Sequence, residues 1–382
     1  MKPIYLDYNA TTPIDPEVAE AMRPYLSEHF GNPSSSHWYG LQTKKAVEQA
    51  RGQVADLLNC SPDEVVFTSG GSESNNYAIK GTAFAQRDKG NHIITSAIEH
   101  PAVIEVCKYL QEKGFQITYL PVDEVGLVDS QQLLNAITPK TILITIMHAN
   151  NEVGTIQPIA EMATIAKDQG IVFHTDAAQS VGKIPTRVDE LAVDLLTGAG
   201  HKLYGPKGIG ALYIRRSTEL EKLIHGADHE QGLRAGTENV LHIVGLGKAC
   251  EIAKRDLEKN MVQMQEMRDL LYQGLRQEWD QIKLNGHPEK RLPNTLSVSF
   301  KNIEANKLLS GIDIGAASAG AACHADSVKI SSVLEAMQVP LEYAMGTIRF
   351  STGKMTTVEE VNHTVAIFVE TIRSLAAEKQ KW

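Results

Sequence analysis

The sequence contains few cysteines, and they are not arranged to hold a metal ion or a disulfide framework. Only 4 cysteines occur in 382 residues. They are far apart and form no CxxC pair, so the sequence indicates neither a zinc site nor structural disulfides. Cys107 and Cys250 lie in helical patterns and are expected to pack, and Cys60 is expected in a loop or at a helix cap. Cys323 lies in a small-residue stretch, AASAGAACHAD, without helical or strand periodicity. We interpret Cys323 as a thiol kept accessible for reaction.

The sequence also lacks long apolar runs and an excess of basic residues. No run approaches the roughly 18 apolar residues of a membrane span. The start of the chain, MKPIYLDYNATTPIDPE, lacks the basic and apolar regions of a secretory signal. The 37 Lys and Arg residues are outnumbered by 46 Asp and Glu, which gives a net charge of −9. This balance argues against nucleic acid or an anionic membrane as the main partner, and we expect a cytoplasmic protein.

The middle of the chain alternates β-rich runs with helical patterns. The β-rich runs span 64–69, 92–96, 115–120, 141–147, 171–176 and 194–198, and the amphipathic segments between them span 73–88, 101–113, 129–136 and 158–169. This alternation is typical of an α/β fold with a mostly parallel sheet and helices on both faces. Ligands of such sheets bind at the carboxyl ends of the strands. A further run, ALYIR at 211–215, is interpreted as an extra edge strand.

The pattern changes after residue 250. A long, charged amphipathic helix begins there, followed by a strand at 294–300, the small-residue stretch and a closing helix. We therefore predict two domains. The large α/β domain spans 15–255, and a smaller α+β domain is built from 1–14 and 256–382 and carries the small-residue stretch with the accessible thiol.

Two motifs stand at the ends of predicted strands. One is a Gly-rich turn that suits an anion, and the other supplies an acid. TSGGSESNN at 68–76 opens a helix, so its Gly-rich turn and the Ser72 hydroxyl suit an anion. The alternative is that Ser72 is only the N-cap of that helix. The motif is neither GxGxxG nor GxxxxGK[ST], which disfavours dinucleotide and P-loop sites. Asp176, in HTDAAQ, ends a strand and points to the ligand crevice, or else caps the next helix.

A third motif places a lysine at the same edge of the sheet. His201 and Lys202 stand in a glycine-bracketed loop directly after the run at 194–198. Most lysines are surface charges, so Lys202 alone is weak evidence. An anion site, an acid and an amine together indicate pyridoxal phosphate, because this cofactor requires an amine for covalent attachment, an acid for its pyridinium proton and a phosphate cup.

A longer series of motifs extends over nearly the whole chain. In order, it reads YLDYNATTPIDPEV, FGNPSSSH, FTSGGSESNN, SAIEHPAV, IMHANNEVGTIQPI, HTDAAQSVGK, GHKLYGPKGIGALY, RAGTENV and GAACHAD. The series resembles the cysteine desulfurases, close to class I, of the fold-type-I pyridoxal-phosphate enzymes. GAACHAD and RAGTENV, with GLGKACE nearby, are especially similar to the selenocysteine lyase branch.

The resemblance implies a role for each residue that matches at the cofactor ring. Lys202 matches the lysine that attaches the cofactor and, once substrate displaces it, takes the Cα proton. Asp176 matches the carboxylate that pairs with the pyridine nitrogen, and Gln179 matches the donor to the phenolate oxygen. His100, in IEHP, matches the histidine that stacks on the ring and is able to shuttle protons. Its alternative role is that of a helix cap.

The phosphate cup is also implied by the resemblance. Gly71, Ser72 and His201 match it, and Thr237 in RAGTEN matches a residue that reaches the phosphate of the partner subunit. This implies a homodimer with the site at the interface. The family often has Ser before GHK where this chain has Ala199, so one hydroxyl of the cup is missing here. Where the family commonly has Gly-Gly-Gly, this chain has Gly-Ala-Asp at 226–228.

The substrate and the nucleophile are matched by three further residues. Asn151, at the cofactor, and Arg349 match the groups that hold the substrate carboxylate, a task that suits the rigid fork of Arg donors. The alternative for Arg349 is a surface strand arginine. Cys323 matches the nucleophile that takes sulfur from bound cysteine as a persulfide and releases alanine, and its alternative is a buried small hydrophobe. His324 either favours the thiolate electrostatically or is a solvated loop residue.

The resemblance predicts a cysteine desulfurase that converts L-cysteine to L-alanine and passes sulfur to an acceptor protein. The second hypothesis is a selenocysteine lyase that releases selenide and alanine. An aminotransferase or an inactive scaffold of the same fold is less well supported, because the loop thiol, Lys202 and Asp176 are all present. The sequence ends soon after its last expected helix, so we expect it to lack the longer tail with which housekeeping members hold an iron–sulfur scaffold protein.

Overall fold

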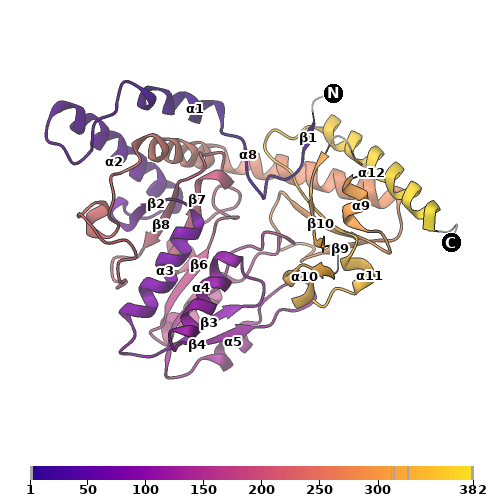
Figure 1. Cartoon of the computed structure of the whole chain (residues 1–382), viewed down its shortest axis with the longest axis horizontal. Helices are drawn as coiled ribbons and strands as arrows, with labels where there is room; N and C mark the ends of the chain where they lie inside the picture. The colour runs from indigo at the N-terminus through magenta and orange to yellow at the C-terminus, as the bar shows by residue number, and fades with distance from the viewer. Residues whose placement is uncertain (1–2, 311, 313–314, 325–326, 380–382) are drawn as a thin grey trace.

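A seven-stranded sheet forms the centre of the larger part of the protein (Figure 1). The computed structural model describes residues 3–310, 312, 315–324 and 327–379. The strands are β2 (Val65–Thr68), β3 (His92–Ser96), β4 (Gln116–Leu120), β5 (Thr141–Thr145), β6 (Val172–Asp176), β7 (Leu195–Ala199) and β8 (Gly210–Ile214). They are ordered β2-β8-β7-β6-β5-β3-β4. All pairs are parallel except those of β8, which is antiparallel to both neighbours.

Strand β8 is not the edge strand that the sequence analysis predicts. It lies between β2 and β7, and all five of its residues are buried. After the loop that contains Lys202, the chain turns back and runs antiparallel to β7, filling the gap between β7 and β2. A short apolar run does not reveal from sequence alone whether one or both of its faces are covered. The other predicted strands and the mostly parallel α/β class are confirmed.

Helices cover both faces of this sheet. They are α1 (Pro16–Met22), α2 (Trp38–Leu58), α3 (Gly71–Ala85), α4 (Pro101–Glu112), α5 (Ser130–Ala136), α6 (Ile159–Asp168) and α7 (Val188–Leu191). One apolar cluster includes α2, α6 and the first part of α8 (Val240–Glu278), and another lies between α3, α4 and the sheet. The carboxyl ends of the parallel strands, where ligands of such sheets bind, lie between these two helical layers.

The C-terminal part of the chain, together with the N-terminal strand β1, forms a second unit of strands and helices beside the large sheet (Figure 1). Its elements are β1 (Ile4–Tyr5), β9 (Ile282–Asn285), β10 (Thr295–Phe300), α9 (Ala305–Ser310), β11 (Gly315–Ala316), β12 (Ser318–Ala319), β13 (Ala321–His324), β14 (Ser327–Ile330), α10 (Ser332–Ala336), α11 (Leu341–Ala344), β15 (Thr347–Ser351) and α12 (Val358–Lys379). A four-stranded sheet has the order β12-β15-β10-β9. Strand β1 pairs with β11, so the N-terminal segment joins this part of the protein.

Helix α8 connects the two parts and begins at Val240, earlier than the charged pattern after residue 250 indicates. Its first three turns are mostly apolar and include Ile243, Leu246 and Ala249, which pack in the apolar cluster of the large sheet, so the charged pattern starts only later. Ala253 belongs to the apolar cluster of the large sheet, whereas Met267 and Leu271 belong to the cluster around β10, β15 and α12. One continuous helix thus contributes to both cores.

No helix among the described residues is both long enough and apolar enough to cross a bilayer. The expected cytoplasmic location stays a prediction.

Two helical glycines provide a matched test of the packing between α2 and α8. A Cβ at Gly247 would lie 2.6 Å from the Cα of Ala50, whereas a Cβ at Gly52 would meet nothing within 4 Å. We expect Gly247→Ala to lower the free energy of unfolding by about 1–3 kcal/mol through overpacking. We expect Gly52→Ala to raise it by about 0.5–1 kcal/mol, because alanine restricts the unfolded chain. Urea denaturation of both variants measures the difference, and equal effects would contradict the close approach of the two helices.

Candidate active site

A cavity of about 260 Å³ opens at the carboxyl ends of β5, β6 and β7. Its lining includes eight residues that the sequence analysis singled out: Gly71, Ser72, His100, Asn151, Asp176, Gln179, His201 and Lys202. They come from the first turn of α3, the start of α4 and the loops or strand ends after β5, β6 and β7. The carboxyl edge of a mostly parallel sheet is where ligands of such folds bind.

Asp176 ends β6 with its carboxylate held from two sides. The Asn75 amide donates to Oδ2 at 2.6 Å, and the Ala178 backbone N–H donates to Oδ1 at 2.9 Å. The second contact is part of a turn, so the structure shows no helix that Asp176 caps. Asn75 Oδ1 is buried without a hydrogen-bond partner. The side-chain acid is thus fixed in position at the base of a polar cavity.

His100 combines the two roles that the sequence leaves open. It is the N-cap of α4, and its Nδ1 accepts from the Ala102 backbone N–H at 3.1 Å. It also lines the cavity. Burial lowers the pKa of His100, and Asp176 opposes that shift. A neutral ring whose Nδ1 accepts a hydrogen bond carries its proton on Nε2, so this ring is able to donate a proton from Nε2.

Lys202 lies at the end of a 3-10 turn, Gly200–Lys202, directly after β7. Its Nζ donates to the backbone oxygens of Asn9 and Ala10, the latter at 2.9 Å. Burial and the nearby Arg349 cation lower the pKa of Lys202, and Asp176 and Asp7 oppose the shift, so that the pKa is about 8. An amine with this pKa is partly unprotonated near neutral pH, which is the form that attacks a carbonyl carbon.

The N-terminus of α3 suits an anion. Its N-cap is Gly70, which provides no side-chain cap, so Ser72 is inside the helix and is not its N-cap. A Cβ at Gly71 would touch only small side chains, the nearest being Ala199 Cβ at 3.4 Å. The first turn of the helix, with its N–H groups and the positive end of its dipole, therefore borders a cradle lined by small side chains. Nearby His201 is neutral, because burial and the surrounding lysines lower its pKa to about 4.

Asn9, which the sequence analysis does not single out, lies at the centre of the hydrogen bonds around Lys202. Its backbone oxygen accepts from Lys202 and from Gln179 Nε2, and its Oδ1 accepts from Lys183 and Asn294. Its Nδ2 donates to Thr295 Oγ1 at 2.8 Å and to the Asn151 backbone oxygen at 3.1 Å. The side chain is 1% exposed.

Arg349 lies beside the cavity on β15 and is not a surface arginine. One of its NH groups donates to Asp7 Oδ1 at 2.7 Å, and another donates to the Asn151 backbone oxygen at 3.1 Å. Its Nε is buried without a partner. The guanidinium is therefore held at the cavity rim with one donor still free to bind.

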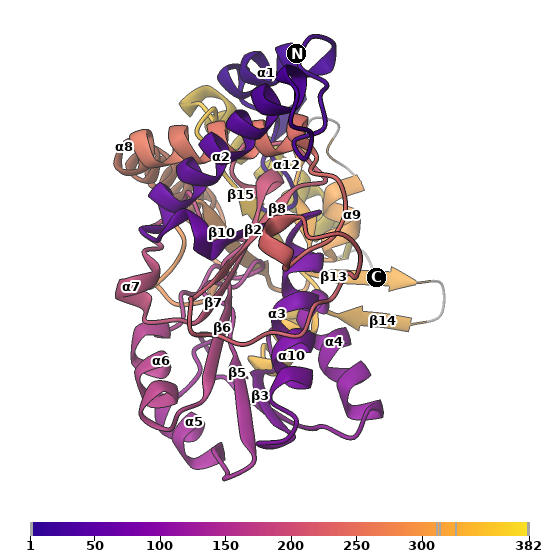
Figure 2. The same cartoon turned by 90° about the vertical axis from the view of Figure 1, so that its left-hand side faces the viewer.

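Two predicted residues lie away from the cavity. Thr237 lines a separate cleft of about 190 Å³ between the end of β2 and the segment before α8. Cys323 lies in β13, which pairs with β14 to form a hairpin that projects from the body of the protein (Figure 2). The root of the hairpin is closed by a hydrogen bond from the Ser331 backbone N–H to the Gly320 oxygen at 2.9 Å, and the Ser331 hydroxyl donates to Glu152.

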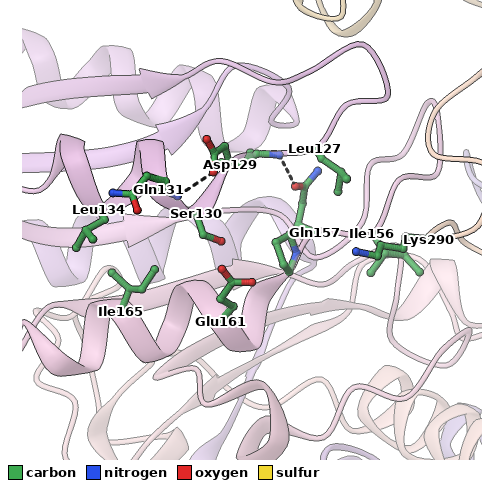
Figure 3. Close-up of a pocket in the computed structure, with 12 residues that line it drawn as sticks. Leu127, Asp129, Ser130, Gln131, Leu134, Ile156, Gln157, Glu161, Ile165 and Lys290 are labelled. Carbon is green, nitrogen blue, oxygen red and sulfur yellow. Dashed lines mark hydrogen bonds between the residues drawn. The ribbon is translucent and has the colours of Figure 1, made fainter.

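A larger cavity of about 640 Å³ lies elsewhere, between the starts of α5 and α6 (Figure 3). It shares no lining residue with the cavity at Lys202. Leu134 and Ile165 form one wall, and Lys290 lies at the opposite end, with Asp129 engaged by the Gln131 backbone N–H. None of the predicted site residues contributes to it.

Comparison with known proteins identifies the family. The class-V aminotransferase model matches residues 4–363. A protein of Dictyoglomus turgidum named cysteine desulfurase IscS is 50% identical over 384 residues, covering 99% of this chain and 98% of the relative. The chain belongs to the aminotransferase class-V family. It is a pyridoxal-phosphate-dependent cysteine desulfurase, and the fold-type-I architecture is confirmed.

Solved structures agree with this assignment. A NifS-like protein has a TM-score of 0.91 and 40% sequence identity, covering 98% of this chain and 100% of that one. A structure described as SspA in complex with cysteine has a TM-score of 0.82 and 41% identity, covering 93% and 100%. Neither these proteins nor the Dictyoglomus relative supports the selenocysteine lyase alternative.

The residues of the cavity fit pyridoxal phosphate. The uncapped first turn of α3 and the Gly71 cradle suit its phosphate, Asp176 suits a protonated ring nitrogen, and Lys202 is the amine that its aldehyde requires. The Asn75 oxygen and the Arg349 Nε are buried polar atoms that still lack partners. Asn9 and Asn75 could have been suspected from sequence, since both stand in the quoted motifs DYNATTP and SGGSESNN.

The lowered pKa of Lys202 predicts how the apoprotein takes up the cofactor. Only the unprotonated amine reacts with the aldehyde, so uptake should accelerate as pH rises and reach half its maximal rate near pH 8. An ordinary lysine would require a pH near 10.4. Removing the Arg349 cation removes a cause of the lowered pKa, so Arg349→Gln should move this midpoint upward.

Stopped-flow growth of the visible absorption band, recorded between pH 6.5 and 10, measures the midpoint. Arg255→Gln is the control, because Arg255 is an exposed arginine that binds Glu17 and Asp256. A wild-type midpoint near pH 10 would show that Lys202 is not buried beside a cation as described.

Proposed function

We propose that this desulfurase holds pyridoxal phosphate in the 260 Å³ cavity and is attached to it through Lys202. The observation that carries the assignment is the conjunction of a buried lysine with a pKa of about 8, a fixed carboxylate at Asp176 and an uncapped helix start at Gly71, all lining one cavity. When bound, the cofactor supplies an aldehyde for the amino group of cysteine and a ring that accepts the electron pair of the Cα–H bond.

Each cavity residue has a binding role in this proposal. Asp176 would pair with the ring nitrogen, Gln179 would donate to the ring oxygen, and His100 would contact the ring with its Nε2 proton available. Gly71, Ser72 and His201 would hold the phosphate. His201 does so as a neutral donor, because its pKa of about 4 leaves it unprotonated near pH 7.

The substrate carboxylate binds between Asn151 and Arg349. Arg349 already donates to the Asn151 backbone, and its unpartnered Nε is available for a carboxylate oxygen. Asp7 holds the guanidinium from behind at 2.7 Å. With the substrate amine at the cofactor, the free Lys202 amine takes up the Cα proton.

Cys323 completes the reaction as the nucleophile. Its thiolate attacks the sulfur of the bound cysteine. A sulfur–sulfur bond forms, the Cβ–S bond breaks, and the carbon that retains the electron pair takes up a proton and leaves as part of alanine. The net change transfers one sulfur atom from cysteine to the enzyme thiol, without an external oxidant. The persulfide then passes to an acceptor protein.

The variant Cys323→Ala tests the persulfide step. We expect it to keep the visible band of the bound cofactor but to lose sulfide release from L-cysteine by roughly a hundredfold or more, because the nucleophile is absent. L-selenocysteine, supplied to the same preparations, compares the two substrates. Cys60→Ala is the control, since its thiol is only partly exposed and burial raises its pKa to about 12. A fully active Cys323→Ala enzyme would rule out the proposed nucleophile.

We also propose that the enzyme is a homodimer in which Thr237 binds the phosphate of the partner subunit. Thr237 is exposed and lies outside the cavity of its own chain. The segment between α1 and α2 and the first turn of α2 expose large apolar side chains, namely Leu26, Phe30, Trp38, Tyr39 and Leu41. Phe30 stacks on Tyr39 at 5.4 Å between ring centroids. An exposed aromatic cluster of this kind suits an interface with a second copy.

The proposed domain division places the boundary within α8. The large domain spans 15–255, and 1–14 with 256–382 form the small domain. The support is that α8 contributes Ala253 to one apolar core and Met267 to the other.

Mixed dimers test the role of Thr237. Lys202→Ala and Thr237→Ala subunits are combined after dissociation and refolding. If Thr237 serves the partner, each mixed dimer contains one site with both wild-type residues. Random pairing of equal amounts makes about half of the dimers mixed, so cofactor binding with normal affinity should reappear in about one site of four in the whole sample. If Thr237 serves its own chain, mixing restores nothing. Mixing Lys202→Ala with itself gives the baseline, and sedimentation velocity checks that dimers form.

A further inference from the structure

Lys183 is a buried lysine beside the cofactor cavity. It is 4% exposed and follows Gln179 by four residues in the turn after β6. It does not line the cavity itself. A lysine so completely removed from water is uncommon and costs stability unless its polar end is hydrogen-bonded.

The amine of Lys183 has two acceptors. It donates to Gln179 Oε1 at 2.8 Å and to Asn9 Oδ1 at 3.2 Å. A neutral amine has two N–H groups, which match these two acceptors, whereas an ammonium has three. Burial lowers the pKa of Lys183 well below its ordinary value, and the nearby cations of Lys202 and Arg349 lower it further. The hydrogen-bond count and the electrostatics therefore agree on a neutral donor.

The contact with Lys183 determines which end of the Gln179 amide faces the cavity. The oxygen and nitrogen ends of an amide have nearly the same shape, so their orientation depends on their partners. Lys183 binds the oxygen end, while the nitrogen end donates to the Asn9 backbone oxygen at 2.9 Å and has a second N–H available. Removing Lys183 would leave Gln179 Oε1 without this partner, but Asn9 Oδ1 would still accept from Asn294 at 2.9 Å.

We propose that Lys183 is a positioning residue that holds the Gln179 amide with its donor end toward the ring oxygen of the cofactor. The inference rests on the proposed role of Gln179. Lys183 touches neither substrate nor cofactor in this assignment, and it acts through the orientation of one amide.

A double-mutant cycle separates this role from a general effect on stability. Wild type, Lys183→Met, Gln179→Met and the double variant are loaded with pyridoxal phosphate. Their visible spectra and cofactor dissociation constants are then measured by absorption and equilibrium dialysis. We expect Lys183→Met to shift the visible band in the same direction as Gln179→Met. It should also weaken cofactor binding about tenfold, equivalent to about 1.4 kcal/mol. The double variant should match Gln179→Met, because residues that act as one unit are not additive.

Arg268→Met is the matched control for loss of a buried basic side chain. Arg268 is 7% exposed and donates to the Leu292 backbone oxygen at 2.9 Å, in the other apolar core. The Arg268→Met variant should lower the melting temperature of the apoprotein, and the visible band of its cofactor-loaded form should stay at the wild-type position. Where Lys183→Met does not fold, Lys183→Leu removes the same donors and the same outcomes apply.

Three results would overturn the inference, and they can be told apart. If Lys183→Met lowers the melting temperature but keeps the wild-type spectrum and dissociation constant, Lys183 is only structural. If the two single effects add in the double variant, Lys183 does not act through Gln179. If Gln179→Met itself leaves the spectrum unchanged, the premise fails. If the visible band of the bound cofactor persisted in Lys202→Ala, that result would instead overturn the proposed function.

Discussion

The arrangement of the active site depends on one buried asparagine, Asn9, whose side-chain hydrogen-bonding groups all have partners. Asn9 accepts hydrogen bonds from the cavity residues Lys202 and Gln179 and from the buried Lys183. It also binds Thr295 and Asn294 of the C-terminal part. Every polar group of its side chain has a partner. A buried group bonded on all sides is costly to displace, because each lost bond leaves an unsatisfied atom. The N-terminal segment thereby fixes the cofactor cavity to the C-terminal layer.

Three basic side chains and two carboxylates lie around this asparagine. Lys183, Lys202 and Arg349 lie near one another, and the neighbouring carboxylates are those of Asp7 and Asp176. Burial and the neighbouring cations lower the pKa of both lysines, which favours their neutral amines. For Lys202 the neutral amine is the form that attacks a carbonyl carbon.

The sequence alone predicts much of this site, and the reasons for the gaps are physical. Strand-end residues such as Asp176 and Lys202 are recognisable because a parallel sheet brings its carboxyl ends to one edge. Asn9 and Lys183 both stand in quoted motifs, but no local pattern predicts that Asn9 contacts Gln179 and Lys183, which follow it by 170 and 174 positions. The sequence also does not predict that β8 lies inside the sheet, because a short apolar run has the same pattern at an edge and in the middle of a sheet. The start of α8 carries few charged residues, so the charged pattern of the later turns does not reveal where the helix begins.

The hairpin that contains Cys323 limits how far the proposed nucleophile can move from the body of the protein. Its root is tied at Gly320 and Ser331, and Ser331 is in turn bonded to Glu152 beside the cavity. Position 323 is the third residue beyond Gly320, and three extended residues span about 10 Å. If Cys323 is the nucleophile proposed above, the sulfur atom that it takes up stays within about this distance of the tied root. The acceptor then has to place its own thiol close to the side from which the hairpin projects.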